Sequence, residues 1–425
     1  MEFWYKFLTY LFYPLSPIYL FWRKLRNKEH PIRYKEKLSF IKLTRGEDFL
    51  IWYHVASVGE AMSILPLIEI FEKNEKVKKI LITTITLSSG RILEKRYSNS
   101  KKVVHQFLPL DIKNVVIKFL DHWKPNLAIF VESEIWPNLI LEIKKKNIPL
   151  LLVNGRITKK TFLRWKFFKN FSKKIFEKID ICIASNKETE KYLQILGAKN
   201  IRNYGNLKFA KSKTSSNLKL DSNFLTKISE RKIWCAASTH PSEEIFCAKT
   251  HLELKKTFNN ILTVIIPRHI NRTDKIADEI SKLNLKVVKY TKLQEIKNET
   301  DILLIDAYGE ALKFYNIAKC VFVGKSLVKS LEQVSGQNPI EPARLGCKIF
   351  HGPNVSNFEE VYEYLKYLNV AKEIRDPLEL SQLLVEEFTS NKVKNVEIIE
   401  KIEKYGENTL ADVVKEINVY INAYK

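Results

Sequence analysis

The 425-residue sequence contains only five cysteines, and no two of them form a CxxC pair. Zinc sites and disulfide frameworks usually show paired cysteines at regular spacing. Three of the five lie in apolar runs that are typical of buried strands. The cysteines (Cys182, Cys235, Cys247, Cys320 and Cys347) therefore indicate a reduced, cytosolic domain and not a disulfide or zinc scaffold.

An arginine-rich tail and a low-complexity basic arm are also absent, although the sequence is strongly basic. Lysines and arginines number 71 against 48 aspartates and glutamates, which gives a formal net charge of +23. Part of this excess reflects a sequence rich in lysine throughout, and the rest suits an acidic substrate or an anionic lipid surface. Without a basic arm, nucleic acid is the least favoured partner, and we predict none.

Long apolar runs are scarce, and residues 3–22 (FWYKFLTYLFYPLSPIYLFW) are the one membrane candidate. This run is about long enough to cross a bilayer, Lys6 is its only charge, and its aromatic residues favour the lipid interface. It lacks a basic start and a small-residue cleavage site, which argues against a cleaved signal peptide. Pro14 and Pro17 would kink a spanning helix. The basic residues directly after the run favour a cytoplasmic location for the rest of the chain.

We therefore predict that residues 1–28 form a hydrophobic membrane anchor, either a single span or a shallowly inserted helix. A buried aromatic helix of the globular domain is the alternative.

After this segment, apolar runs typical of strands alternate with amphipathic stretches typical of helices. The predicted strands are Phe49–Val55, Lys79–Thr84, Val103–Phe107, Leu127–Val131, Pro149–Val153, Ile181–Ala184 and Ile201–Tyr204 in the first half, and Ile233–Ala237, Ile261–Ile266, Lys286–Tyr290, Ile302–Ile305, Val321–Val323 and Lys348–Phe350 in the second. Strands separated by helices indicate βαβ units and a mostly parallel sheet. The sequence thus predicts an α/β fold with two Rossmann-like domains that face a cleft.

The domain boundaries follow from breaks in this alternation. Residues 211–230 are rich in serine, lysine and asparagine, as linkers are. We therefore predict an N-terminal domain at 29–210, a linker at 211–230, a C-terminal domain at 231–408 and a final helix at 409–425.

The stretch YHVASVGE (53–60) joins the first predicted strand to a helix with apolar residues on one face. In open α/β sheets, ligands bind where strands end and helix N-termini point. We expect Glu60 to face this crevice and not the core. The alternative is that Glu60 only complements the dipole of the helix that it begins.

Polar clusters follow several other predicted strands. They are Glu132–Ser133–Glu134 and Asn154–Gly155–Arg156 in the first half, and 237–240 (ASTH), 267–269 (PRH), 309–310 (GE) and 335–341 (SGQNPIE) in the second. In an extended chain Glu132 and Glu134 point opposite ways, so we expect at most one to face the cleft. Glu134 is alternatively an acid at a helix start. Residues 335–339 are typical of a phosphate-binding loop, and Glu341 is placed to accept two sugar hydroxyls.

These motifs, taken in order, resemble those of the 3-deoxy-D-manno-oct-2-ulosonic acid (Kdo) transferases of Gram-negative bacteria, over nearly the whole length. The matching segments are HVASVGE (54–60), FLPLD (107–111), ESEIWPNL (132–139), NGR (154–156), GNLKF (205–209), ASTHPSEE (237–244), PRH (267–269), YGE (308–310), SGQNPIEPARLG (335–346) and GPNVSNF (352–358). The resemblance implies the GT-B glycosyltransferase fold. It also implies transfer of Kdo from CMP-Kdo to the 6′ hydroxyl of the lipid A precursor, lipid IVA, at the cytoplasmic face of the inner membrane, with membrane lipids as further partners.

The resemblance also assigns roles to residues. Glu60 takes the role of general base, and Glu134 is a candidate second acid. The family's nucleotide site places Lys208, Ser238, Thr239, His240, Arg268, His269, Glu310, Asn338 and Glu341 around CMP. We add Ser57, Gly59, Arg156, Gly309, Gly336 and Gln337 as candidate binding residues.

The mechanism that these roles imply uses no metal. The acceptor hydroxyl is a poor nucleophile until a base removes its proton. The phosphate of the leaving CMP needs donors, which Lys208, Arg268 and the 335–339 loop can supply. The sequence contains no Asp-x-Asp motif, and we predict neither a metal nor a cofactor beyond the donor, CMP-Kdo.

Two positions depart from the family pattern, and two other functions compete with it. The family often has alanine where Gly155 stands, and Gly-Gly-His where 335–337 reads Ser-Gly-Gln. The first rival is another GT-B enzyme, such as a lipid-A disaccharide synthase or a nucleotide-sugar epimerase, which would use a uridine nucleotide. The second is a non-enzymatic basic protein, which would bind with a steep salt dependence and no need for Glu60.

Overall fold

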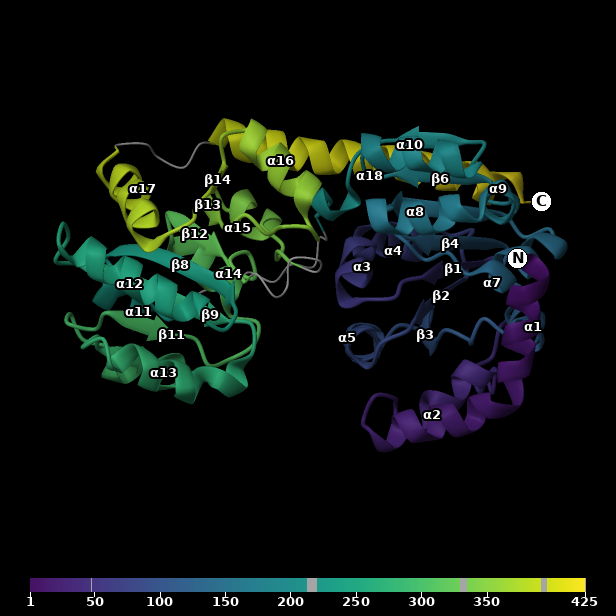
Figure 1. Ribbon diagram of the computed structural model, residues 1–425, viewed down its shortest axis with the longest axis horizontal. Helices are drawn as coiled ribbons and strands as arrows, with labels where there is room; N and C mark the ends of the chain where they lie inside the picture. The colour runs from purple at the N-terminus through teal and green to yellow at the C-terminus, as the bar shows by residue number, and fades with distance from the viewer. Residues whose placement is uncertain (47, 212–219, 329–334, 391–395, 425) are drawn as a thin grey trace. The chain divides into compact units, whose positions relative to one another are not determined.

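The computed structural model describes residues 1–46, 48–211, 220–328, 335–390 and 396–424 (Figure 1). The chain forms two compact units. Unit 1 comprises Met1–Thr214 together with Lys404–Lys425, and unit 2 comprises Ser215–Glu403. Within the described residues, each unit contains one seven-stranded sheet whose paired strands are all parallel. The predicted α/β class with two parallel-sheet domains is therefore confirmed.

The sheet of unit 1 has the strand order β3-β2-β1-β4-β5-β6-β7. Its strands are β1 (Leu50–His54), β2 (Lys79–Thr84), β3 (Val103–Phe107), β4 (Leu127–Val131), β5 (Leu150–Gly155), β6 (Ile181–Ala184) and β7 (Ile201–Asn203). Its helices are α1 (Glu2–Phe12), η1 (Tyr13–Leu15), α2 (Ser16–Leu25), η2 (Arg33–Leu38), α3 (Val58–Ser63), α4 (Leu65–Glu72), α5 (Leu87–Tyr97), α6 (Lys113–Trp123), α7 (Pro137–Lys145), α8 (Lys159–Phe167), α9 (Lys169–Phe176), α10 (Lys187–Leu196) and η3 (Leu207–Phe209). The long helix α18 (Val396–Ala423) contributes its last part to this unit.

Alternate side chains of each strand fill two separate cores, which explains why the strands read as continuous apolar runs. In β1, Leu50 and Trp52 face a core that helices α6 to α10 complete. Ile51 and Tyr53 face the opposite core, which α3, α4 and the C-terminal part of α18 complete. Both faces of the sheet are thus covered, and the strand ends are left as the place for polar residues.

Unit 2 repeats this architecture with the strand order β10-β11-β9-β8-β12-β13-β14. Its strands are β8 (Lys232–Thr239), β9 (Ile261–Pro267), β10 (Val287–Lys289), β11 (Ile302–Leu304), β12 (Cys320–Val323), β13 (Lys348–His351) and β14 (Ala371–Glu373). Its helices are α11 (Ser222–Ile228), α12 (Glu243–Lys255), η4 (Ile270–Arg272), α13 (Thr273–Ser281), η5 (Tyr290–Glu295), α14 (Ala311–Ile317), α15 (Ile340–Arg344), α16 (Glu359–Tyr367) and α17 (Pro377–Thr389). All five cysteines of the chain are buried.

Three sequence predictions differ from the structure. The predicted linker 211–230 contains helix α11, which Asp221 caps through the Phe224 N–H and which buries Phe224 and Ile228; its residues 212–219 lie outside the described residues. The C-terminal helix begins at Val396 and not at 409. The helix expected after Glu60 is two helices, because Ile64 ends α3 and Pro66 opens α4.

The aromatic N-terminal run forms two short helices, α1 and α2, that meet at the bend η1 (Figure 1). Pro14 lies in this bend and Pro17 in the first turn of α2, where prolines are tolerated. Many large apolar side chains of this pair are exposed, namely Phe3, Trp4, Phe7, Leu8, Tyr10, Leu11, Leu15, Ile18, Phe21, Trp22 and Leu25. Across the described ranges, none of the helices combines the length and the hydropathy that crossing a bilayer demands.

Polar contacts fasten this helix pair to the rest of unit 1. On α1, the Tyr5 hydroxyl donates a 2.6 Å hydrogen bond to the buried carboxylate of Asp111. Asp111 also accepts the backbone N–H groups of Asn138 and Leu139 at the start of α7. After α2, the buried Glu29 forms ion pairs with Arg23 at 2.6 Å and Lys37 at 2.7 Å.

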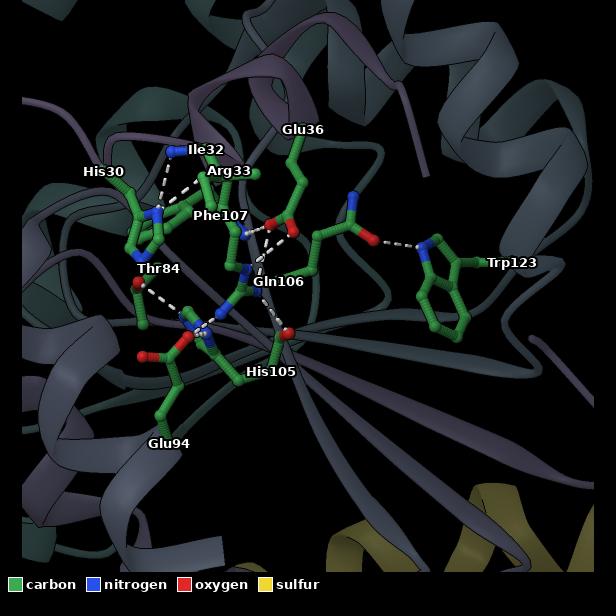
Figure 2. A network of polar contacts seen from close by, with 10 residues as sticks. All are labelled: His30, Ile32, Arg33, Glu36, Thr84, Glu94, His105, Gln106, Phe107 and Trp123. Carbon is green, nitrogen blue, oxygen red and sulfur yellow. Dashed lines mark hydrogen bonds and ion pairs between the residues drawn. The ribbon is translucent and has the colours of Figure 1, made fainter. Parts of the chain in front are cut away.

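The segment directly after α2 is bound to the edge strand β3, as Figure 2 shows. The guanidinium of Arg33 donates two hydrogen bonds to Glu36, at 2.7 and 3.0 Å, and a third to the His105 carbonyl at 2.7 Å. Glu36 in turn accepts the Phe107 N–H at 2.9 Å. These contacts cover an edge that would otherwise present unpaired backbone groups, and they hold the N-terminal segment in one position on unit 1.

Candidate functional site

Glu60 lies where β1 passes into α3, and its side chain folds back over the turn. The Ser57 hydroxyl caps α3 by accepting the Glu60 N–H. The Glu60 carboxylate accepts the Ala56 N–H at 2.7 Å and the Ser57 hydroxyl at 3.0 Å. This reciprocal arrangement is a variant of the capping box. Glu60 is only 8% exposed, so it is less open than the sequence predicted, whereas nothing lies within 4 Å of where a side chain on Gly59 would begin.

Two further acids lie beside Glu60, both in the turn after β4. Glu132 adopts a left-handed conformation, with φ of 57°, so the chain is not extended here and the expectation that the two acids diverge is wrong. Glu132 forms a 2.7 Å ion pair with Lys208. Glu134 accepts hydrogen bonds from His54 at 3.0 Å and from Trp136 at 2.8 Å.

The electrostatics of this cluster distinguish Glu60 from its neighbours. Burial raises the pKa of Glu60 to about 7, and the negative charges of Glu132 and Glu134 add to the rise. Burial also opposes ionisation of Glu134, but the hydrogen bonds from His54 and Trp136 hold its pKa below the usual value. Glu60 therefore exchanges a proton near neutral pH, which is the property that a general base needs.

The remaining predicted residues of unit 1 surround the same turn. The Arg156 N–H donates to the Glu132 carbonyl at 3.3 Å, directly after β5. Asn154 accepts the Leu207 N–H at 2.8 Å and so holds η3, which carries Lys208, against the end of β5. Ser57, Gly59, Glu60, Glu134, Arg156 and Lys208 therefore lie at neighbouring strand ends of one unit. Glu132, the other acid of the cluster that follows β4, joins them because of its turn and its pairing with Lys208.

In unit 2, the predicted residues after β8 and β9 are joined by backbone contacts. Ser238 has a left-handed backbone, with φ of 54°. The Arg268 N–H donates to the Thr239 carbonyl at 3.0 Å, and the rings of His240 and His269 lie 5.8 Å apart at nearly a right angle. Burial lowers the pKa of His240 to about 4, and nearby positive charges, first that of Lys325, lower it further. His240 is thus neutral at pH 7 among cations.

The other predicted residues of unit 2 follow β11 and β12. Gly336 has φ of 82° and donates its N–H to the Lys325 carbonyl at 2.8 Å. The Gln337 carbonyl accepts the Tyr362 hydroxyl at 3.1 Å. Asn338 accepts the N–H of Ile340 at the start of α15, the helix whose first turn carries Glu341.

Gly309 and Glu310 lie in the turn that precedes α14, and Gly309 has φ of 85°. Glu310 forms a 2.6 Å ion pair with Lys313 one turn further along this helix. The hydrogen bonds from Lys313 and Tyr290 outweigh the effect of burial and hold the pKa of Glu310 below its usual value. Glu310 is therefore an ionised acceptor at the end of β11.

Two residues of unit 2 that the sequence did not single out organise these loops. The buried carboxylate of Glu243 accepts the N–H groups of His240, Lys325, Ser326 and Leu327, at 2.9, 2.7, 2.9 and 3.0 Å. Lys325 follows β12 with φ of 57°. Acids in the first turn of a helix, such as Glu243 and Glu244 in α12, commonly complement the helix dipole, and the sequence alone does not indicate that Glu243 binds the loop after another strand.

The chain has two α/β units, each with a parallel sheet and with polar residues at the ends of its strands. This architecture is that of a GT-B-like protein. The UDP-GlcNAc 2-epimerase from Neisseria meningitidis shares this fold, with a TM-score of 0.55 and 15% identity over 88% of this chain and 99% of that one. At this identity the likeness describes the fold alone.

The sequence comparisons are more specific. Residues 32–211 match the family model described as 3-deoxy-D-manno-octulosonic-acid transferase (kdotransferase). The 3-deoxy-D-manno-octulosonic acid transferase of Rickettsia bellii is 32% identical over 96% of this chain and 94% of its own length. The enzyme of the same name from Haemophilus influenzae is 29% identical over 92% and 91%. The chain belongs to the Kdo transferase family and is a glycosyltransferase.

Proposed function

We propose that this transferase moves Kdo from CMP-Kdo to the lipid A precursor lipid IVA, inverts the anomeric centre and releases CMP. The proposal rests above all on Glu60, a buried carboxyl whose pKa lies near 7 beside an open glycine turn. Its relatives of the same family are named Kdo transferases and match it over nearly their whole lengths. A base of this kind suits a hydroxyl acceptor, since the hydroxyl must lose its proton as the new bond forms.

In the proposed reaction, Glu60 accepts the proton of the lipid 6′ hydroxyl while the oxygen bonds to the anomeric carbon of Kdo. The bond from that carbon to the phosphate oxygen breaks, and CMP leaves with the electron pair. Attack from the side opposite the leaving group inverts the configuration. Arg268 and the loop at 335–339 are suited to stabilise the charge that develops on the phosphate.

Lys208, which the resemblance assigned to the nucleotide, is paired with Glu132 in unit 1. We propose that this ion pair holds the Glu132 side chain in position beside Glu60 before the donor binds. No step of this proposed reaction requires a metal ion.

We further propose that the enzyme works at the cytoplasmic face of the inner membrane. The exposed aromatic residues of α1 and α2, with Arg23 and Lys24 in the last turn of α2, have the composition of interfacial helices. Contact with the bilayer would bring the enzyme to an acceptor that is itself embedded in lipid.

The proposed function is tested by a transfer assay with CMP-Kdo and lipid IVA, with the products read by mass spectrometry. Wild type should add the mass of Kdo. Glu60→Gln should still bind CMP but lose at least about 100-fold in rate, the usual scale for a general base. The exposed Glu75 supplies a matched control, Glu75→Gln, which should keep full activity.

Full activity of Glu60→Gln would remove this residue from the mechanism. Folded wild-type protein that yields no product would contradict the substrates, and uridine nucleotide sugars would then be screened in the same assay.

A further inference from the structure

Lys325 occupies a backbone conformation that suits glycine better than lysine. It follows β12 with φ of 57°, in the left-handed region where a Cβ is unfavourable. The position before it, Gly324, is closed to side chains, because a Cβ there would lie 2.7 Å from both Glu243 Oε2 and the Ser238 carbonyl. Lys325 is therefore the first residue after β12 whose side chain this turn can accommodate.

Glu243 fixes the turn that carries Lys325 through hydrogen bonds to the backbone of that turn. Its carboxylate, which is 1% exposed, accepts three successive N–H groups, of Lys325, Ser326 and Leu327, and a fourth from His240. The hydrogen bonds described for this carboxylate come from backbone N–H groups, and none of them comes from the Lys325 ammonium. The adjacent acid, Glu244, is paired with Arg272 at 3.0 Å.

The turn that carries Lys325 adjoins other cationic and imidazole groups, because Glu243 accepts the backbone N–H groups of both Lys325 and His240. Burial lowers its pKa and the charge of Arg268 lowers it further, and the charges of Lys325, His269 and Arg268 all act on His240. Among the described residues, neither Lys325 nor Arg268 has a carboxylate partner, and His240 Nε2 has no hydrogen-bond partner. Cationic side chains that lie close together are suited to bind an anion such as phosphate through charge-assisted hydrogen bonds.

We propose that the Lys325 ammonium binds the phosphate of the donor nucleotide together with Arg268, and that Glu243 positions it through the backbone of the turn. This inference rests on the proposed function, since it takes the anion to be the phosphate of a sugar nucleotide. It adds Lys325 to the binding residues and gives Glu243 a positioning role.

The test measures the binding of CMP and of cytidine, which lacks the phosphate, to the full-length protein by calorimetry. Lys325→Gly removes the cation and relieves the backbone, so the fold should be kept. Its affinity for CMP should fall about 10- to 100-fold, the range for a charge-assisted hydrogen bond, while cytidine binding stays unchanged. Lys325→Arg should keep most of the affinity for CMP.

Lys124 provides a matched control, because it is also a left-handed lysine, with φ of 40°, but caps α6 in unit 1. Lys124→Gly should bind CMP as wild type does. The proposal is overturned if Lys325→Gly binds CMP within twofold of wild type, or if CMP and cytidine weaken equally. If wild type binds UMP and not CMP, the proposed donor is wrong, and the same comparison made with UMP still decides the role of Lys325.

Discussion

Glu60 owes its high pKa to neighbouring charges as well as to burial, and this dependence can be measured. A general base works only when deprotonated, so kcat/KM of wild type should rise with pH through a pKa of about 7. Glu132→Gln removes the largest of the neighbouring negative charges. Loss of this charge favours the ionised form of Glu60, so the acidic limb of the profile should move to lower pH.

The measurement is the pH dependence of kcat/KM for wild type and Glu132→Gln, with Glu75→Gln as the control that should leave the limb in place. The result to compare is the pH at the midpoint of the acidic limb, because this midpoint reports the pKa of Glu60, whereas the maximal rate does not. A limb that stays at the wild-type pH, or moves upward, contradicts the assignment of Glu132 as the charge that tunes Glu60.

At the scale of residues, the sequence predicted the motifs of the site better than their contacts. Glu60 was recognisable because strand, small residues and helix follow one another within a few positions. The roles of Glu132, Glu243 and Lys325 could not be predicted, because they depend on partners far away in the chain: Lys208 for the first, and one another for the other two. A left-handed backbone at Glu132 and at Lys325 leaves no signature in a single sequence either.

The elements that carry the proposed membrane contact are α1 and α2. Phe3 is 71% exposed and Trp4 is 59% exposed, and both lie on α1. The double variant Phe3→Ser/Trp4→Ser should bind vesicles that contain anionic lipid at least about tenfold more weakly in a flotation assay, since large apolar side chains contribute most to interfacial binding.

The matched control is Tyr367→Ser, on α16 of unit 2, where the side chain is 82% exposed. This variant should bind the vesicles as strongly as wild type does. Equal flotation of wild type and the double variant would show that α1 is not a lipid-binding element.

The strands were the elements most readily predicted, because a parallel sheet buried on both faces requires continuous apolar runs. β14 was missed since its three residues, Ala-Lys-Glu, carry no such signal. Helix α11 was missed because it is short and lies in a stretch with the composition of a linker. The cap at Asp221 and the packing of Phe224 and Ile228 stabilise it.

At the scale of the molecule, α18 ties the last residues of the chain to its first domain. Val413, Ile417 and Ile421 are buried in the core beneath one face of the unit 1 sheet. Ile417→Ala should therefore destabilise unit 1 by about 2–5 kcal/mol, the range for large-to-small changes in a core. Val419→Ala on the same helix, where the side chain is 59% exposed, should cost little.

Denaturant unfolding followed by tryptophan fluorescence measures this difference, because every tryptophan except Trp234 lies in unit 1. Equal midpoints for the two variants would mean that α18 does not support the core of unit 1.

Because α18 belongs partly to unit 1, the two units cannot complete folding in the order in which they are synthesised. Domains generally fold as units while the ribosome is still at work. Unit 2, which ends at Glu403, has all of its residues before the last helix is complete. The sheet of unit 1 is made first, yet one face is only partly covered, by α3 and α4, until Ile421 has left the ribosome. The half of the enzyme that is synthesised first is thus the half that is finished last.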